Sequence, residues 1–178
     1  VGWGILFGRN AQEAGDLCLI SRRAAEASVT PFMNVQDGFL TTHTVESVRL
    51  TEPDFMKEFI GKPDDRLLNL MDPDNPVMSG VVQNQDSYMK GKIAQRWYYD
   101  QVEGALADAF EEFYRQTGRK YDFVEPYRCD DADYILVGMG SYMETTQATV
   151  DYLREKKGIA AGCLNLCCFR PFPSRQII

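Results

Sequence analysis

The chain has 178 residues, 44% of them hydrophobic and 25% charged, a composition that supports a buried core and excludes a disordered segment. Its 19 Lys and Arg against 26 Asp and Glu give a formal net charge of −7, which argues against nucleic acid and anionic lipid as partners. No apolar run approaches the roughly 18 residues that a membrane span needs. Nucleic-acid and membrane partners are therefore set aside.

The two ends of the chain are abrupt. It opens on an apolar, glycine-rich run without an initiator Met, and no basic segment precedes that run as in a secretory signal. It closes shortly after an apparent strand exit at residues 169–173. We therefore expect a segment cut from something longer.

The five cysteines are an odd set, which points to the cytoplasm rather than to a disulfide framework. Cys163, Cys167 and Cys168 fall in a stretch typical of a buried strand. Adjacent residues on a strand point to opposite faces, so Cys167 and Cys168 are poorly placed to ligate one metal ion. Small buried hydrophobes are the favoured interpretation over a zinc or iron–sulfur site.

The first forty residues predict strand, helix and strand. Residues 5–7 form a short apolar run between glycines, and Asn10 stands as a helix N-cap with Glu13 three residues on. Residues 32–35 give the next strand, which exits into a turn at Asp37. A strand–helix–strand unit of this kind favours parallel pairing and α/β architecture.

The middle of the chain, residues 61–95, is rich in turn signals, and only residues 66–71 could hold a helical turn or two. A long, weakly periodic stretch in a compact domain is often a functional or interface loop. A structured excursion that covers a neighbouring domain is an equally good interpretation.

The pattern becomes regular again at residues 102–113, an amphipathic helix stopped by Gly118. Residues 119–131 look like a connector, and residues 132–139 predict a buried strand. We place a domain boundary near Glu125, inside the connector.

A second strand–helix–strand unit closes the chain. Ser141 with Glu144 resembles another capping box, Gly158 ends the helix, and residues 159–169 predict one further strand. The expected fold class is therefore α/β, a three-layer αβα arrangement with mostly parallel sheets.

Gly138 and Gly140 form a G-x-G where a strand turns into a helix, as in a dinucleotide fold. Met143 stands where the fingerprint needs its third glycine, and no acidic residue follows the next strand to hold a ribose. A tight turn without nucleotide is favoured, although the helix N-terminus could accept an anion.

His43 is the only histidine, so a histidine-rich metal site is excluded. It lies shortly after a strand end, at the sheet edge where α/β proteins bind ligands, and could carry a proton or bind an anion. The alternative is that Thr41, Thr42 and His43 cap a helix or pair across a domain interface.

Two further clusters are weaker signals. Asp64, Asp65, Asp72 and Asp74 lie in turns but lack the glycine and late glutamate of a calcium loop, so solvated carboxylates are favoured. The aromatic run at residues 97–99 could stack a ring, but more often marks a buried interface.

Taken in order, several stretches resemble the pyruvate:ferredoxin (flavodoxin) oxidoreductase family, the thiamine-pyrophosphate-dependent 2-oxoacid oxidoreductases. They resemble the family's "QEA", "PF…DGFRTSHE" and "QNPDxY" segments and its passage into the following domain, at residues 11–14, 31–43, 83–88, 117–121, 137–141 and 169–172. The similarity runs nearly end to end, and the ordered series is more specific than any one motif.

The resemblance implies a cytoplasmic enzyme that decarboxylates a 2-oxoacid on thiamine pyrophosphate with Mg, passes electrons through iron–sulfur clusters to ferredoxin or flavodoxin, and forms acyl-coenzyme A. It implies that residues 1–125 are the later part of a pyrimidine-binding, thiamine-diphosphate-binding-like domain. Residues 126–178 would begin a transketolase-C-terminal-like domain. The remaining domains or subunits of the oxidoreductase would be partners, with a homodimer expected.

The resemblance also implies where the site lies. The activating glutamate, the Mg-diphosphate residues and the cluster cysteines belong to other parts of such a protein, so no catalytic and no metal-ligating residue is assigned here and the segment alone should be inactive. The residues expected near the cofactor or substrate are Asp37, Gly38, Phe39, Thr41 and His43, with Gln83, Asn84 and Tyr88 as secondary candidates.

Two departures from the family pattern bear on the substrate. Leu40 stands where the pattern has Arg, which removes a cation that could pair with an anionic group, and Gln85 replaces a Pro. A preference for a 2-oxoacid other than pyruvate is the resulting hypothesis. The alternative function is a non-catalytic α/β assembly module that kept the fold without the chemistry, with a nucleotide-binding Rossmann domain a distant third.

Overall fold

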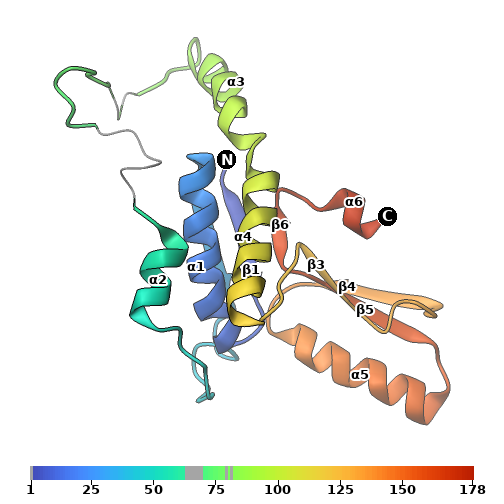
Figure 1. Ribbon diagram of the computed structural model, residues 1–178. Helices are drawn as coiled ribbons and strands as arrows, with labels where there is room; N and C mark the ends of the chain where they lie inside the picture. Colours follow the sequence, from blue (N-terminus) through green and yellow to red (C-terminus); the bar gives the residue numbers. More distant parts are fainter. Residues whose placement is uncertain (1, 63–69, 79, 81) are drawn as a thin grey trace.

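The computed structural model describes residues 2–62, 70–78, 80 and 82–178 (Figure 1). Its strands form two three-stranded sheets, of order β2-β1-β6 and β3-β5-β4. The strands are β1 (Gly4–Gly8), β2 (Phe32–Gln36), β3 (Val124–Tyr127), β4 (Tyr134–Gly138), β5 (Ala161–Leu166) and β6 (Cys168–Arg170). The helices are α1 (Ala11–Ser28), α2 (Pro53–Ile60), α3 (Tyr88–Tyr99), α4 (Val102–Thr117), α5 (Tyr142–Lys157) and α6 (Ser174–Ile177).

The first strand–helix–strand unit forms as predicted. The strands β1 and β2 run parallel, with Leu6 opposite Asn34. The helix α1 between them begins at the predicted cap, where the side chain of Asn10 accepts a hydrogen bond of 2.9 Å from the backbone N–H of Glu13.

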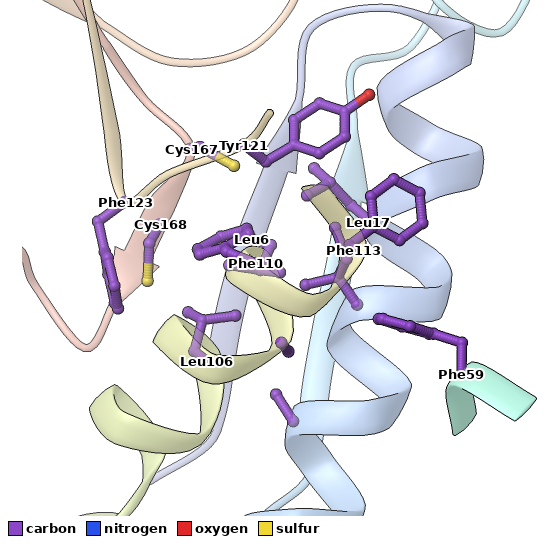
Figure 2. Close-up of a cluster of buried hydrophobic side chains, with 13 residues drawn as sticks. Leu6, Leu17, Phe59, Leu106, Phe110, Phe113, Tyr121, Phe123, Cys167 and Cys168 are labelled. Atoms are coloured by element: carbon purple, nitrogen blue, oxygen red, sulfur yellow. The ribbon is translucent and has the colours of Figure 1, made fainter. Parts of the chain in front are cut away.

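The main core lies where α1 and α4 cover the first sheet. Phe110 and Phe113 of α4 point toward Leu6 of β1 and Leu17 of α1, and Phe59 of α2 reaches the same cluster (Figure 2). The rings of Phe59 and Phe113 meet edge to face, with centroids 5.4 Å apart. The amphipathic helix predicted at residues 102–113 is thereby confirmed, as is its end at Gly118, which adopts a left-handed conformation.

The single strand predicted at residues 159–169 is wrong, because the chain leaves one sheet and enters the other at Cys167. The carbonyl of Cys167 accepts a hydrogen bond of 2.8 Å from Phe7 N–H, and Cys168 N–H donates to Phe123 over 3.0 Å. One continuous segment therefore belongs to both sheets. Cys163, Cys167 and Cys168 are all buried, as the sequence predicted.

The connector predicted at residues 119–131 contains β3, which pairs antiparallel with β5. Pro126 argued against a strand in the sequence, because proline has no backbone N–H to donate to a neighbouring strand. Proline is therefore confined to edge strands, and β3 is an edge strand. The expected parallel pairing holds for β1 with β2 and for β4 with β5, whereas β6 and β3 add one antiparallel pair to each sheet. The predicted α/β class is confirmed, with mixed sheets.

The strand β4 was predicted as buried, and in this chain it is not. Its four residues from Tyr134 to Val137 are between 45% and 69% exposed. Its composition is that of a central strand covered on both faces, but in the described part of the chain β4 is an edge strand that pairs only with β5.

The middle of the chain contains two helices that the turn signals obscured, α2 and α3. The helix α3 has no buried residue, so its sequence lacks the apolar stripe by which an amphipathic helix is predicted. Trp97 on α3 is 75% exposed, so the described residues do not form the buried interface expected for the aromatic run. The helical turn proposed for residues 66–71 falls mostly outside the described residues.

The acidic turn residues behave as solvated carboxylates where they are described. Asp72 accepts hydrogen bonds of 2.9 Å from Asp74 N–H and from the side chain of Asn75. Asp64 and Asp65 lie outside the described residues. Of the helices in the described ranges, none combines the length and apolar character required to cross a membrane.

Candidate functional site at the junction of the two sheets

The segments that leave β1, β2 and β4 meet at one place. The side-chain amide of Asn10, at the start of α1, donates to the carboxylate of Glu144 in the first turn of α5 over 2.7 Å. The carboxylate of Asp37, directly after β2, accepts from the backbone N–H of Ser141. The carboxyl ends of three strands and the N-termini of two helices therefore form a common edge, which is where α/β folds bind ligands.

Asp37 caps α5 from outside the helix. Gly140, next to it, has a φ of +84°, and an ideal Cβ at this glycine would lie 2.5 Å from Asp37 Oδ2. A side chain at position 140 would therefore be strained and would displace the carboxylate. The capping box predicted for Ser141 and Glu144 is not formed, because the Ser141 side chain makes no cap and Asp37 takes its place.

The loop after Asp37 presents two aromatic rings to solvent. Phe39 is 77% exposed and has a φ of 60°, a left-handed conformation that is uncommon for a bulky residue. Its ring stacks on that of His43, with centroids 4.9 Å apart and planes 27° apart. Thr42 closes the loop, because its Oγ1 lies 2.7 Å from His43 Nδ1 and accepts from Phe39 N–H over 3.1 Å.

Thr41 and Gly38 complete the set of predicted site residues on this loop. The hydroxyl of Thr41 is shielded from solvent and has no hydrogen-bond partner among the described residues. Such a group costs free energy unless a bound molecule pairs with it. Gly38 has open space around it, and its carbonyl accepts from Leu40 N–H over 2.8 Å.

The same loop continues across the N-terminus of α1 and is tied there. Glu46 accepts from Ala11 N–H over 3.1 Å. Gln12 accepts from Arg49 N–H over 2.7 Å and donates to the Arg49 carbonyl over 3.1 Å. These contacts fix the position of the loop relative to the first helix and so fix the orientation of the stacked rings.

A buried ion network lies between the start of α1 and the strands β3 and β5, and the sequence analysis did not predict it. Arg9 Nη2 is 2.5 Å from Glu13 Oε1 and 2.7 Å from Glu125 Oε2, and the amide of Asn165 donates to Glu125 over 3.2 Å. Burial raises the pKa of Glu125 above its ordinary value, and the charge of Arg9 opposes that shift. The network joins the start of α1 to β3 and β5, so it links the two sheets.

A second buried network, also missed, surrounds Asp16 on α1. Arg119 contacts its two oxygens at 2.6 and 2.9 Å, and Tyr121 donates to Asp16 Oδ2 over 2.7 Å. Burial, followed by the hydrogen bond to Asp16, raises the pKa of Tyr121 well above its ordinary value. The sequence signal that could have found both networks is a pair of carboxylates, Glu13 and Asp16, on the helical face that carries the core residues.

The secondary candidates Gln83, Asn84 and Tyr88 lie elsewhere. All three are exposed; Tyr88 is the first residue of α3, and Gln83 and Asn84 lie just before it. The helix α3 is held near the beginning of the chain by a hydrogen bond of 3.0 Å from Gln95 to the Gly2 carbonyl. That is the amino end of β1, whereas the stacked rings follow the carboxyl end of β2, which is parallel to β1 (Figure 1). The structure does not bring the two groups together.

The cysteines do not fit an iron–sulfur cluster. Burial raises the pKa of the Cys168 thiol to about 12 and that of Cys167 well above its ordinary value, which disfavours the thiolate that ligates iron. Within the described ranges no three His, Cys, Asp or Glu side chains are grouped so that they could hold a metal ion.

Comparison with models of protein families identifies the family to which the chain belongs. Residues 1–111 match the family model described as pyruvate flavodoxin/ferredoxin oxidoreductase, thiamine diphosphate-binding. The chain belongs to this oxidoreductase family. Residues 132–178 match a second model, pyruvate:ferredoxin oxidoreductase core domain II. The resemblance seen in the sequence motifs is thereby confirmed.

Individual members of the oxidoreductase family match the chain over 99% of its length. Pyruvate synthase subunit PorA of Thermotoga maritima is 37% identical, and the chain covers 45% of it. Ketoisovalerate oxidoreductase subunit VorA of Pyrococcus abyssi is 31% identical, also with 45% covered. Pyruvate-flavodoxin oxidoreductase of Trichormus variabilis is 32% identical, with 15% covered. The chain thus spans less than half the length of these relatives.

Proposed function

We propose that the chain is part of a cytoplasmic 2-oxoacid oxidoreductase that uses thiamine diphosphate, converts a 2-oxoacid to acyl-coenzyme A and passes electrons to ferredoxin or flavodoxin. The observation that carries this proposal is the match over 99% of the chain to a pyruvate synthase subunit and to a ketoisovalerate oxidoreductase subunit. Residues 1–125 would be the later part of the pyrimidine-binding domain, and residues 126–178 the start of the next domain. Other domains or subunits, and a second copy in a homodimer, would complete the enzyme.

Within that enzyme the loop after β2 would form one wall of the cofactor cleft. Phe39 and His43 offer stacked, exposed rings against which a planar heterocycle can pack, and Thr41 offers a hydroxyl that has no hydrogen-bond partner in the described ranges. Thiamine diphosphate, when bound, supplies the electron sink for decarboxylation. The contribution of this chain would be to orient the bound molecules and to exclude water at the cleft wall.

The role of Asp37 in this proposal is positional. Its carboxylate holds the start of α5 against the loop that carries Phe39 and His43, so it would fix the position of this wall of the proposed cleft. The Mg ion that accompanies the diphosphate, and the iron–sulfur clusters that carry electrons, would be bound by other parts of the enzyme.

Leu40 bears on the choice of substrate, because the family pattern has a cation at this position. It is 57% exposed beside the stacked rings, so an arginine there could pair with an anionic group in the cleft. We propose that the enzyme prefers a 2-oxoacid other than pyruvate. Turnover of pyruvate, 2-oxoglutarate and 2-oxoisovalerate by the intact enzyme and its Leu40→Arg variant tests this, and a clear lead for pyruvate in the unmodified enzyme would reject it.

A second candidate function is a non-catalytic assembly module, and the exposed apolar strand β4 favours it. The two functions differ in the intact mass and visible spectrum of the native protein. A much larger polypeptide or complex that is brown from iron–sulfur clusters supports the oxidoreductase. A colourless protein of 20.2 kDa supports the assembly module.

A further inference from the structure

The loop that carries the stacked rings is exposed along most of its length. Residues 42–50 all lie in solvent, so burial of apolar side chains does not hold this segment in place. Its contacts with the first turn of α1 are hydrogen bonds. Glu46 accepts from Ala11 N–H, and the side chain of Gln12 contacts the backbone of the loop at one residue, Arg49. The orientation of the rings therefore depends on a small number of polar contacts.

The side-chain amide of Gln12 engages three partners at once. Its Oε1 accepts from Arg49 N–H over 2.7 Å. Its Nε2 donates over 3.1 Å to the Arg49 carbonyl and over 3.1 Å to Asp16 Oδ2. The opposite orientation of the amide would direct its oxygen at two acceptors, the carbonyl and the carboxylate. Only the orientation observed satisfies all three partners.

Asp16 gives Gln12 a fixed support. It lies one helical turn further along α1, so the two side chains share a face of the helix. Asp16 is only 3% exposed, and its oxygens are held by Arg119 at 2.6 and 2.9 Å and by Tyr121 at 2.7 Å. A buried carboxylate with several donors has little freedom to move. Gln12 therefore ties the exposed loop to a buried network.

We propose that Gln12 is a positioning residue for the active site, which holds the loop so that Phe39 and His43 are in place before substrate binds. This inference rests on the proposed function, because it takes the loop as one wall of the cofactor cleft. Without the Gln12 amide the loop would occupy several positions, and binding would have to select one of them. The apparent dissociation constant then rises by the inverse of the fraction in that position. The chemical step after binding is unchanged.

The test compares the intact enzyme with its Gln12→Met variant, which keeps the length of the side chain and removes its hydrogen bonds. Amide hydrogen exchange at Arg49, resolved by mass spectrometry, should become at least about tenfold faster, because its N–H loses its acceptor. The KM should rise at least about tenfold while kcat stays within about twofold. The substrate is whichever of pyruvate, 2-oxoglutarate and 2-oxoisovalerate the unmodified enzyme turns over fastest.

Two further variants make the comparison specific. Gln12→Glu has nearly the same shape but directs an acceptor at Asp16 and at the Arg49 carbonyl, so it should show the same changes as Gln12→Met. Gln116→Met, on the exposed surface of α4, removes a local contact with Glu112 and should leave exchange at Arg49 and KM unchanged. Circular dichroism of each variant shows whether it folds.

Unchanged exchange at Arg49 in both Gln12 variants would overturn the proposal. A fall in kcat at constant KM would also overturn it, because that result indicates loss of active enzyme rather than loss of loop position. Faster exchange with unchanged kcat and KM would instead refute the place of the loop in the cleft, and with it the role of Gln12 in the reaction. The exchange measurement thus separates failure of the anchor from failure of the proposed function.

Discussion

The carboxylate of Asp37, at the end of β2, accepts a hydrogen bond from the backbone N–H of Ser141, at the start of α5. This contact joins residues 104 positions apart and places a negative charge at a helix N-terminus. Together with the pairs Asn10–Glu144 and Arg9–Glu125, it holds the two sheets against each other.

The first prediction concerns this contact. Asp37→Ala leaves the backbone N–H of Ser141, at the start of α5, without its acceptor, so it should lower the free energy of unfolding by about 1–2 kcal/mol. Urea denaturation measures this. Asp54→Ala, in the exposed first turn of α2, is the matched control and should lower stability much less, because its side chain is in solvent and accepts no hydrogen bond from the helix backbone among the described residues. Equal stability of the two variants would contradict the capping role.

Replacement of Gly140 by alanine should change stability in the opposite direction from replacement of a glycine inside a helix. Gly140→Ala should destabilise the protein by about 1–2 kcal/mol, because φ is +84° and the new Cβ would meet the Asp37 carboxylate. Gly15→Ala, inside α1, should instead stabilise by about 1 kcal/mol, because its Cβ position has no described atom within 4 Å apart from its chain neighbours and the backbone of its own helix. Thermal unfolding of both variants distinguishes them, and opposite shifts in melting temperature are expected.

The Asp16 network should matter more than a surface ion pair. Arg119→Met leaves the buried Asp16 carboxylate with neutral donors only, so we expect a loss of about 2 kcal/mol in the free energy of unfolding. Arg115→Met removes the exposed pair with Glu112 and should change stability little. Chemical denaturation of the two variants in parallel checks this, and similar losses would show that burial does not distinguish the two pairs.

Tyr121 gives a pH dependence with a defined sign. Its pKa is raised in the folded state by burial and by Asp16, from an ordinary value of 10.0. The unfolded chain therefore releases this proton first, and stability falls as the pH rises above about 10. The stability advantage of the unmodified protein over Tyr121→Phe should shrink by about 1 kcal/mol between about pH 10 and about pH 11. A constant difference across this range would contradict the assignment.

The sequence predicted those parts of the fold that rest on local signals. The cap at Asn10, the apolar stripe of α4 and the glycine stop at Gly118 all depend on neighbouring residues, and all three are confirmed. The break at Cys167 could not be predicted, because the change of sheet is determined by contacts with Phe7 and Phe123, which are distant in the chain. The strand β3 was missed partly for the same reason, since in the described part of the chain it pairs with β5, which is distant in sequence.

For the candidate site, the motif after β2 predicted which residues share one loop but not how they are used. Asp37 was expected near the cofactor, and the structure shows its carboxylate engaged with α5, a contact that no local pattern announces. The residues of the two ion networks were missed as a group because their partners, such as Glu125 and Arg119, are far from α1 in sequence. Whether the loop residues contact a cofactor or substrate stays a prediction.

The most direct test of the central claim is steady-state turnover by the intact enzyme, followed as 2-oxoacid- and coenzyme-A-dependent reduction of an electron-accepting dye. Phe39→Ala and His43→Ala should each lower kcat/KM at least about tenfold, because they remove the stacked rings at the cleft wall. Tyr152→Ala, an exposed aromatic on α5, should leave it unchanged. Activity equal to the unmodified enzyme in both loop variants would contradict the assignment of this loop to the active-site wall.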